Sequence, residues 1–277
     1  MNYSDQAVTI DSLSAKAFGA DIRGKGQYDV KTGAYAAEAD VNGLDVTAVP
    51  KMPVAAMGVV SASLRAVGNS QDSSIAATGT VQASNLSYNG LTADQASADV
   101  TYDGHIVTVH NGHAEAGSGS LDISGSYDVD QQRPQFSFTA HDLPLDMASP
   151  LLSIPMSGTA DAAGHIDGQN WDLAFSAKDG QIKGMAFDSI NGSAHGQGKQ
   201  IEIPALYWRR GEGLHTLTGR ADLDSRTVDA SLTTSHIRVE QLLPLVGKDD
   251  LPLTGWADNT VTIKGTLDNP SLSVRSA

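Results

Sequence analysis

The stretch Gly26-Gln27-Tyr28-Asp29 decides the fold, because it recurs at a nearly fixed distance along the chain. It returns 99 positions later (26 to 125) as Gly125-Ser126-Tyr127-Asp128, and 94 positions after that (125 to 219), with more change, as Gly219-Arg220-Ala221-Asp222. Self-similarity at a steady period is typical of repeat architectures, in which each unit stacks on its neighbours. The sequence therefore predicts a repeat array.

A second landmark keeps the same offsets and indicates the type of secondary structure. Val8-Thr9-Ile10 returns as Val107-Thr108-Val109 and then as Ile201-Glu202-Ile203. Apolar and polar residues alternate in each copy, as they do in a strand with one buried and one solvated face. Strands are predicted at 7–13, 20–24, 34–41, 106–109, 120–124 and 135–140. Short turns such as 29–33 and 128–133 separate them, so neighbouring strands should be antiparallel.

Three Leu-, Val- and Met-rich segments with prolines interrupt the alternation, at 44–53, 143–155 and 237–252. We expect one or two helical turns at each, most clearly at Val239–Leu243, where the apolar spacing is helical and Gly247 is a stop signal. These seams divide a single elongated repeat domain, 1–277, into a partial unit 1–53, units 54–151 and 152–249, and a partial unit 250–277. Both ends are strand-like, so we expect a piece of a longer array.

Composition restricts the possible functions. The net charge of −14 and the pI near 4.7 argue against a nucleic-acid partner, which needs a basic surface. The chain has no cysteine, which excludes disulfides and thiolate metal sites. Aromatic residues make up only 5% of the chain. The large apolar side chains that the chain does have can cover one face of a sheet, but they are few for a thick core.

No catalytic motif is present, and we expect neither an enzyme nor a cofactor. Pairs such as Gly24-Lys25-Gly26 lack the third glycine and the helix of a phosphate loop. His110 and His113 stand on either side of Asn111-Gly112, which predicts a hairpin turn across which they could meet with His105. Solvent-facing histidines are the simpler interpretation, and no metal site is predicted. Aspartates crowd the turns, where they stabilise the backbone.

Positions that stay apolar from repeat to repeat are the candidate binding residues. The alternation alone leaves two interpretations open, a dry core between two sheet faces or the lining of an open trough. The candidates are Val8, Ile10, Ile22, Val107, Val109, Leu121, Ile123, Phe136, Phe138, Leu173, Phe175, Ile201, Ile203, Leu217, Leu232, Val261 and Ile263.

The order of these motifs resembles that of the AsmA-like family, and within it most the TamB branch. The resemblance rests on a restart glycine at Gly255-Trp256-Ala257 followed by Gly265-Thr266-Leu267-Asp268-Asn269-Pro270-Ser271-Leu272, on the seam 143–158, and on 121–128. It spans essentially the whole chain, although each motif alone is of low complexity. It implies a periplasmic protein anchored to the inner membrane through a segment outside this sequence, with a lengthwise-curved, taco-like sheet.

The resemblance also implies a function. The apolar groove of such a sheet would conduct the acyl chains of phospholipid from the inner to the outer membrane and so support outer-membrane biogenesis. An outer-membrane protein of the TamA type would be a second partner, through regions that this sequence does not contain. Two other readings stay open: a structural or adhesive β-repeat surface protein, and a carbohydrate-active enzyme, which would need paired carboxylates in an aromatic-lined cleft.

Overall fold

The structure is a computed structural model that describes residues 2–4, 7–50, 56–88, 90–149, 154–238, 255–266 and 268–276. Nearly all of these residues lie in β-strands, so the predicted all-β class is confirmed. The chain divides into two compact units, Met1–Ser153 and Ile154–Ala277, which are described separately below.

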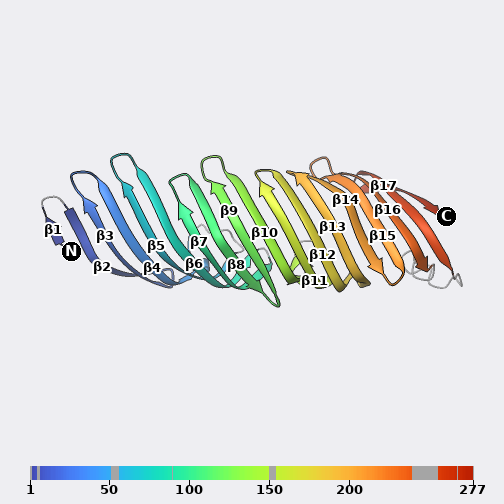
Figure 1. The fold of residues 1–277 in the computed structure, drawn as a ribbon, viewed down its shortest axis with the longest axis horizontal. Helices are drawn as coiled ribbons and strands as arrows, with labels where there is room; N and C mark the ends of the chain where they lie inside the picture. Colours follow the sequence, from blue (N-terminus) through green and yellow to red (C-terminus); the bar gives the residue numbers. More distant parts are fainter. Residues whose placement is uncertain are drawn as a thin grey trace. The chain divides into compact units, whose positions relative to one another are not determined.

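Unit 1 is an antiparallel meander, in which each strand pairs with the next one along the chain (Figure 1). The sheet is not closed. Its strands are β1 (Asn2–Ser4), β2 (Ala7–Ala17), β3 (Ala20–Asp29), β4 (Ala34–Asp45), β5 (Met57–Asn69), β6 (Ser74–Tyr88), β7 (Leu91–Tyr102), β8 (Ile106–Ala116), β9 (Gly119–Asp128) and β10 (Arg133–Pro144).

Unit 2 follows the same rule, with antiparallel pairing between consecutive strands. Its strands are β11 (Met156–Asp167), β12 (Asn170–Ile182), β13 (Met185–Gln197), β14 (Gln200–Arg210), β15 (Gly213–Asp222), β16 (Thr227–Arg238), β17 (Trp256–Thr266) and β18 (Asn269–Ser276).

One sequence repeat corresponds to six strands. The three copies of the deciding stretch end β3, β9 and β15, and the three copies of the second landmark lie in β2, β8 and β14. The strands are longer than predicted, because β8 runs over Ile106–Ala116 and not only over 106–109. The prediction stopped where the simple alternation stops, although the pairing continues beyond that point.

An extra residue in β8 explains this interruption, and it recurs in six other even-numbered strands. Between β8 and β9, Val109 pairs with Gly125 and Gly112 with Ile123, so β8 advances three residues while β9 advances two. Wherever the register shifts, the longer strand is an even-numbered one: β2, β4, β6 and β8 in unit 1, and β12, β14 and β16 in unit 2. Such bulges bend a strand and increase its twist.

The prediction of a hairpin turn at Asn111-Gly112 was therefore wrong. Asn111 has the left-handed φ of 48° that a turn would need, but it serves the bulge in the middle of β8. Asparagine tolerates this conformation in a bulge as well as in a turn, so the dipeptide alone cannot distinguish them. His110 and His113 consequently lie along one strand and do not meet across a turn.

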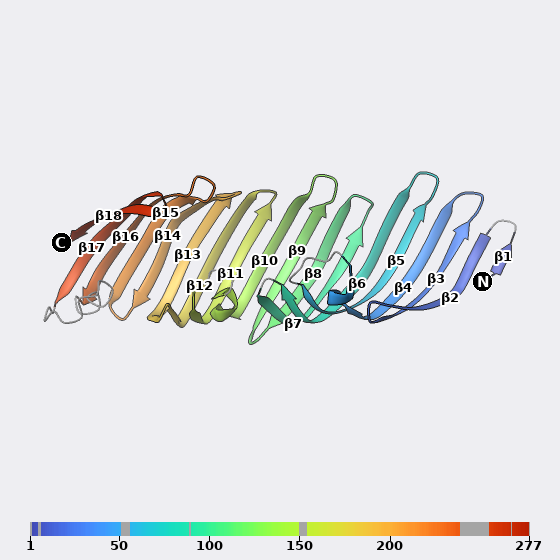
Figure 2. The same ribbon diagram turned by 180° about the vertical axis from the view of Figure 1, so that it is seen from behind.

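Short 3-10 helices occupy the first two predicted seams. These are η1 (Val46–Ala48) and η2 (Leu145–Ala148). The carboxylate of Asp45 accepts a hydrogen bond from the Thr47 backbone nitrogen at 2.9 Å and caps η1. In Figure 2 both helices lie on the side of the unit 1 sheet that faces the viewer. The third predicted seam lies almost wholly outside the described residues.

Few side chains are fully enclosed. Among the described residues, the hydrophobic side chains that are nearly inaccessible are Ala20, Val46, Ala116, Ala140, Ala177, Phe187 and Ile190. Four of these seven are alanines, and no larger side chain is completely buried in the described part of the chain. Within either unit the described strands thus form one layer, which excludes a dry core between two sheets inside a unit.

We predict that Asn111→Val destabilises the protein by about 1–3 kcal/mol, because a β-branched residue is strained at φ 48°. Asn111→Gly removes the same amide but keeps the conformation accessible, so it is the matched control. Urea unfolding followed by circular dichroism measures both variants. Equal loss in the two would show that the amide hydrogen bond to Asp99, and not the backbone conformation, carries the effect.

Candidate functional site

Cross-strand pairing divides the unit 1 sheet into two chemically different faces. Gly125 pairs with Val109 on one side and with Phe136 on the other, and Ile123 pairs with Phe138. Residues directly opposite one another point to the same side of a sheet, so these side chains share one surface, here called the apolar face. The alternate positions, such as Asp122, form the polar face.

Unit 2 has the same arrangement. Leu173 and Phe175 in β12 pair with Ala194 and Gly192 in β13. Further along, Leu217 in β15 pairs with Leu232 in β16, which pairs with Val261 in β17. The alternate positions carry residues such as Asp172, His195 and Glu202. Unit 2 therefore also has an apolar and a polar face.

The structure places all seventeen predicted candidates on the apolar face of their own unit. The candidates of unit 1 are Val8, Ile10, Ile22, Val107, Val109, Leu121, Ile123, Phe136 and Phe138, and those of unit 2 are Leu173, Phe175, Ile201, Ile203, Leu217, Leu232, Val261 and Ile263.

Sequence reasoning missed the contribution of β4–β7 to this face. Leu64 and Val100 both pair with Gly79, and Val81, two residues further along β6, pairs with Ala98, so all of these residues share the apolar face. Apolar and polar residues alternate along these strands too. The strands are rich in alanine and glycine, however, so no column of large apolar residues marks them. The period-two pattern at 79–83 and 96–102 is the signal that could have found them.

The apolar face is only partly covered. Ile10 retains 39% of its surface, Leu13 55% and Leu64 38%, and the phenylalanines of β10 are neither buried nor fully exposed. In a sheet with one face on a core, such residues would be enclosed. Here each is shielded mainly by its neighbours on the same layer, so the face remains accessible to an apolar ligand.

Large side chains lie over glycines of the adjacent strand, so on this face they stay close to the backbone of the sheet. A methyl group on Gly196 would come within 2.7 Å of the Trp171 ring, and one on Gly125 within 2.8 Å of Cδ1 of Phe136. The rings therefore rest on the neighbouring backbone. This packing lets few large residues cover a wide sheet, which accounts for the low aromatic content of the sequence.

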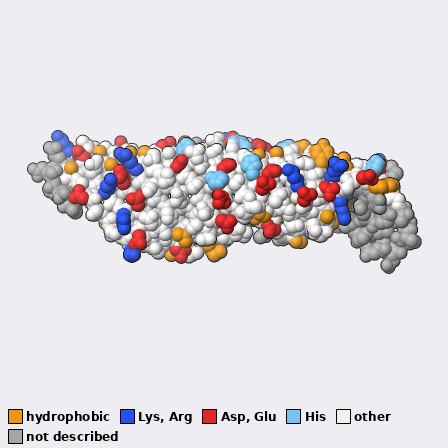
Figure 3. All heavy atoms as spheres, turned by 60° about the horizontal axis from the view of Figure 1, so that its bottom comes forward, with side chains coloured by type: hydrophobic (Ala, Val, Ile, Leu, Met, Phe, Trp, Pro, Cys, Tyr) orange, Lys and Arg blue, Asp and Glu red, His pale blue; other side chains and the backbone are white. Residues whose placement is uncertain are grey.

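The polar face carries exposed ion pairs between neighbouring strands, such as Lys25–Glu38 at 2.8 Å and Lys264–Asp229 at 3.5 Å. In Figure 3 acidic, basic and histidine side chains gather on the face turned to the viewer, in unit 1 and in unit 2 alike. Exposed pairs of this kind contribute little to stability. Their main consequence is that this face stays solvated.

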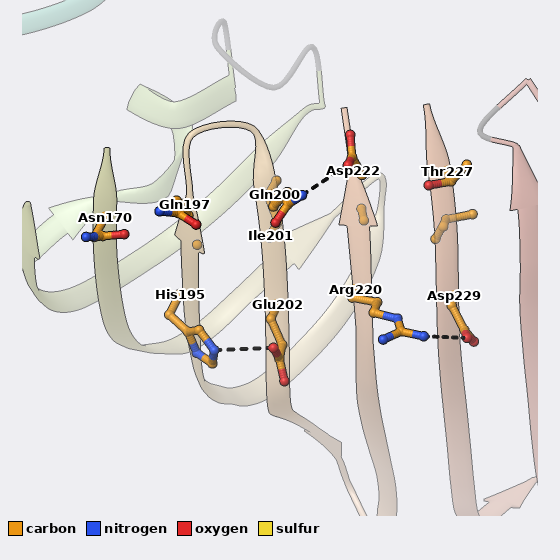
Figure 4. A pocket seen from close by; sticks show the side chains of 13 residues that line it. Asn170, His195, Gln197, Gln200, Ile201, Glu202, Arg220, Asp222, Thr227 and Asp229 are labelled. Atoms are coloured by element: carbon orange, nitrogen blue, oxygen red, sulfur yellow. Dashed lines mark hydrogen bonds and ion pairs between the residues drawn. The ribbon is translucent and has the colours of Figure 1, made fainter. Parts of the chain in front are cut away.

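The polar face is hollowed in several places. One hollow, of about 700 Å³, is in unit 2 and is shown in Figure 4. His195 Nε2 lies 3.4 Å from Glu202 Oε2, Arg220 Nη2 lies 3.7 Å from Asp229 Oδ2, and Gln200 donates to Asp222 at 3.4 Å. Each of these charged groups is thus paired with a neighbour in an open setting.

The three histidines considered for a metal have separate partners. Nδ1 of His105 lies 2.6 Å from Asp130, Nδ1 of His113 lies 2.7 Å from Asp122, and His110 contacts Thr101. No group of three or more metal-binding side chains gathers within the described part of the chain. The hydrogen bond that His105 donates to the Asp130 carboxylate raises the pKa of His105 above its ordinary value. This ion pair therefore contributes to the stability of the fold at acidic pH, and its contribution is lost as the pH rises through the raised pKa of His105.

Gly196→Ala should destabilise unit 2 by about 1–3 kcal/mol, because the added methyl group would collide with Trp171 and with the Gln200 carbonyl. The displaced indole should also shift its fluorescence emission. Ser193→Ala, on the polar face of the same strand, is the control. Unchanged emission together with unchanged urea stability would contradict the packing of Trp171 over this glycine.

Comparison with family models, with curated proteins and with solved structures finds no match for this chain. Among the described residues, no helix has the length and hydrophobicity to span a membrane. Any functional conclusion therefore depends on the residues themselves.

Proposed function

We propose that this chain is a lipid-transfer segment whose apolar face conducts the acyl chains of phospholipids between the inner and outer membranes, as the resemblance to the AsmA-like family and its TamB branch implies. One observation carries the proposal: within each unit, a wide and regular apolar face is left without a second layer of described strands. Large accessible apolar surfaces mark binding sites in proteins.

The shape that this function needs is a trough. The extra residues recur at matching positions of equivalent strands, in β2, β8 and β14 and again in β4 and β16, and bulges bend strands where they occur. We propose that the sheet of each unit curves at these bulges and that the apolar face is the inner side. η1 and η2 would then lie at one margin of the trough.

The energetics suit movement along the face. Each methylene removed from water contributes about 0.8 kcal/mol of binding free energy. A fourteen-carbon chain fully withdrawn from water would therefore gain roughly 10 kcal/mol before the entropic cost of ordering it. Because the repeats present similar residues at each level, a sliding chain exchanges one apolar contact for a similar one. The mechanism would be guided diffusion, with the charged face kept in water.

A structural or adhesive repeat protein is the alternative. It would not need an accessible apolar face, since such a surface favours aggregation. Extraction of the purified 277-residue chain with organic solvent, followed by mass spectrometry, distinguishes the two. The proposal expects co-purified phospholipid after production in a bacterium with two membranes, whereas an adhesive array should yield none.

A photo-crosslinking amino acid locates the lipid on one face. Phe138 and Thr139 are consecutive in β10 but point to opposite faces, as do Leu173 and Ala174 in β12. We expect lipid adducts from a benzophenone at Phe138 or Leu173, and few from Thr139 or Ala174. Equal yields from both faces would argue against binding to the apolar face.

Charged substitutions should stop lipid binding without unfolding the sheet. Val109→Asp and Leu121→Arg place a charge on the partly accessible apolar face, where an alkyl chain would have to displace its water. We expect the co-purified phospholipid to fall at least severalfold. Ser124→Arg, on the polar face of β9, should retain it. Loss of the β-sheet circular dichroism signal in the first two variants would instead assign these residues to an essential core.

A further inference from the structure

One row of the apolar face differs in chemistry between the repeats. Cross-strand pairs link three residues at the same level in each repeat, at positions related by the offsets of 99 and 94. The rows are Ala15, Ile22 and Val41 in β2–β4; Ala114, Leu121 and Ala140 in β8–β10; and Trp208, His215 and Thr234 in β14–β16. The first two are wholly apolar. The third, here called the polar row, is not.

The polar row is a packed arrangement on consecutive strands. The Trp208 and His215 rings lie 5.1 Å apart between centroids, tilted by 36°. Thr234, the next member, is only 6% exposed, and its hydroxyl donates to the Asn259 backbone carbonyl at 3.3 Å. A threonine so enclosed on an apolar face is unusual, because hydroxyl burial costs free energy unless hydrogen bonds offset it.

Hydrogen-bond donors in this row point to a ligand with acceptor atoms. The indole Nε1 of Trp208 is buried and has no hydrogen-bond partner among the described residues. An indole nitrogen can only donate, and a buried donor left unpaired costs about 1–3 kcal/mol. Burial, and then the nearby Arg210 guanidinium, lower the pKa of His215, so its imidazole is neutral at pH 7 and offers one further N–H.

Arg210 adds positive charge at the margin of the row. It lies two positions after Trp208 in β14, so the alternation places it on the same side of the strand. None of the ion pairs among the described residues includes Arg210, although the chain as a whole carries a net charge of −14. A basic side chain beside buried donors favours an anion over a neutral polar group.

We propose that the polar row binds the oxyanion of an anionic amphiphile, a carboxylate or phosphate joined to an alkyl chain that lies on the apolar face of unit 2. Trp208 Nε1 and His215 would donate to the oxyanion, and Arg210 would balance its charge. This inference rests on the proposed function and adds a position at which the head of the lipid is recognised. The two apolar rows of unit 1 would accept only the chain.

The internal repeat supplies the variants for the test. His215→Leu with Thr234→Ala gives the polar row the residues of β9 and β10, which the same fold already accommodates. Trp208→Phe keeps an aromatic ring but removes the donor. Titration calorimetry with the 277-residue chain, below micelle-forming concentrations, would use dodecyl phosphate, dodecyl maltoside and inorganic phosphate as probes. Circular dichroism checks that each variant keeps its sheet.

We expect the unaltered chain to bind dodecyl phosphate about tenfold more tightly than dodecyl maltoside, as hydrogen bonds to a charged group predict. Both variants should lose this preference and keep the affinity for dodecyl maltoside. A preference that survives in the variants, no preference in the unaltered chain, or equally tight binding of inorganic phosphate would each overturn the inference and leave the proposed function intact. Failure to bind either amphiphile would overturn both.

Discussion

The antiparallel backbone ladder between consecutive strands is the interaction on which the rest of this protein depends. In a compact domain, a closely packed interior supplies most of the stability. Here the nearly inaccessible hydrophobic side chains among the described residues are few and mostly small, as Ala20, Ala116 and Ala177 show. Each strand is instead held by the hydrogen bonds and side-chain pairs that it makes with the strands before and after it. Such a sheet can be extended by repetition without a second layer.

This construction has a consequence for function. Alternation along every strand gives each unit an apolar face, and the single layer leaves that face partly accessible. Most sheets hide such a surface against helices or a second sheet. The aromatic rings that lie over Gly125 and Gly196 stay close to the backbone and do not enclose the face. An accessible apolar surface therefore arises from the same packing that builds the sheet from few large residues.

The repeats also act as an internal comparison. The two rows of unit 1 show which residues the architecture needs at one level, namely Ala, Ile, Leu or Val. Trp208, His215 and Thr234 at the same level depart from that requirement, and the indole nitrogen remains unpaired. Native structures retain few unpaired buried donors. A departure confined to one copy of a repeat is more readily explained by a ligand than by the fold.

The sequence alone determined the all-β class, the antiparallel order and the side of the sheet on which the seventeen candidates lie, because these depend on a period of two and on short turns that are visible in any single repeat. It also located the helical turns of η1 and η2. It could not determine the strand lengths or the role of Asn111-Gly112, since a bulge and a turn use the same backbone conformation and only pairing with β7 and β9 distinguishes them. It left open whether a second sheet covers the apolar face. Only the tertiary structure shows that, within each unit, no second sheet of described strands covers this face. The covering of a face depends on contacts between distant strands, which no local pattern encodes.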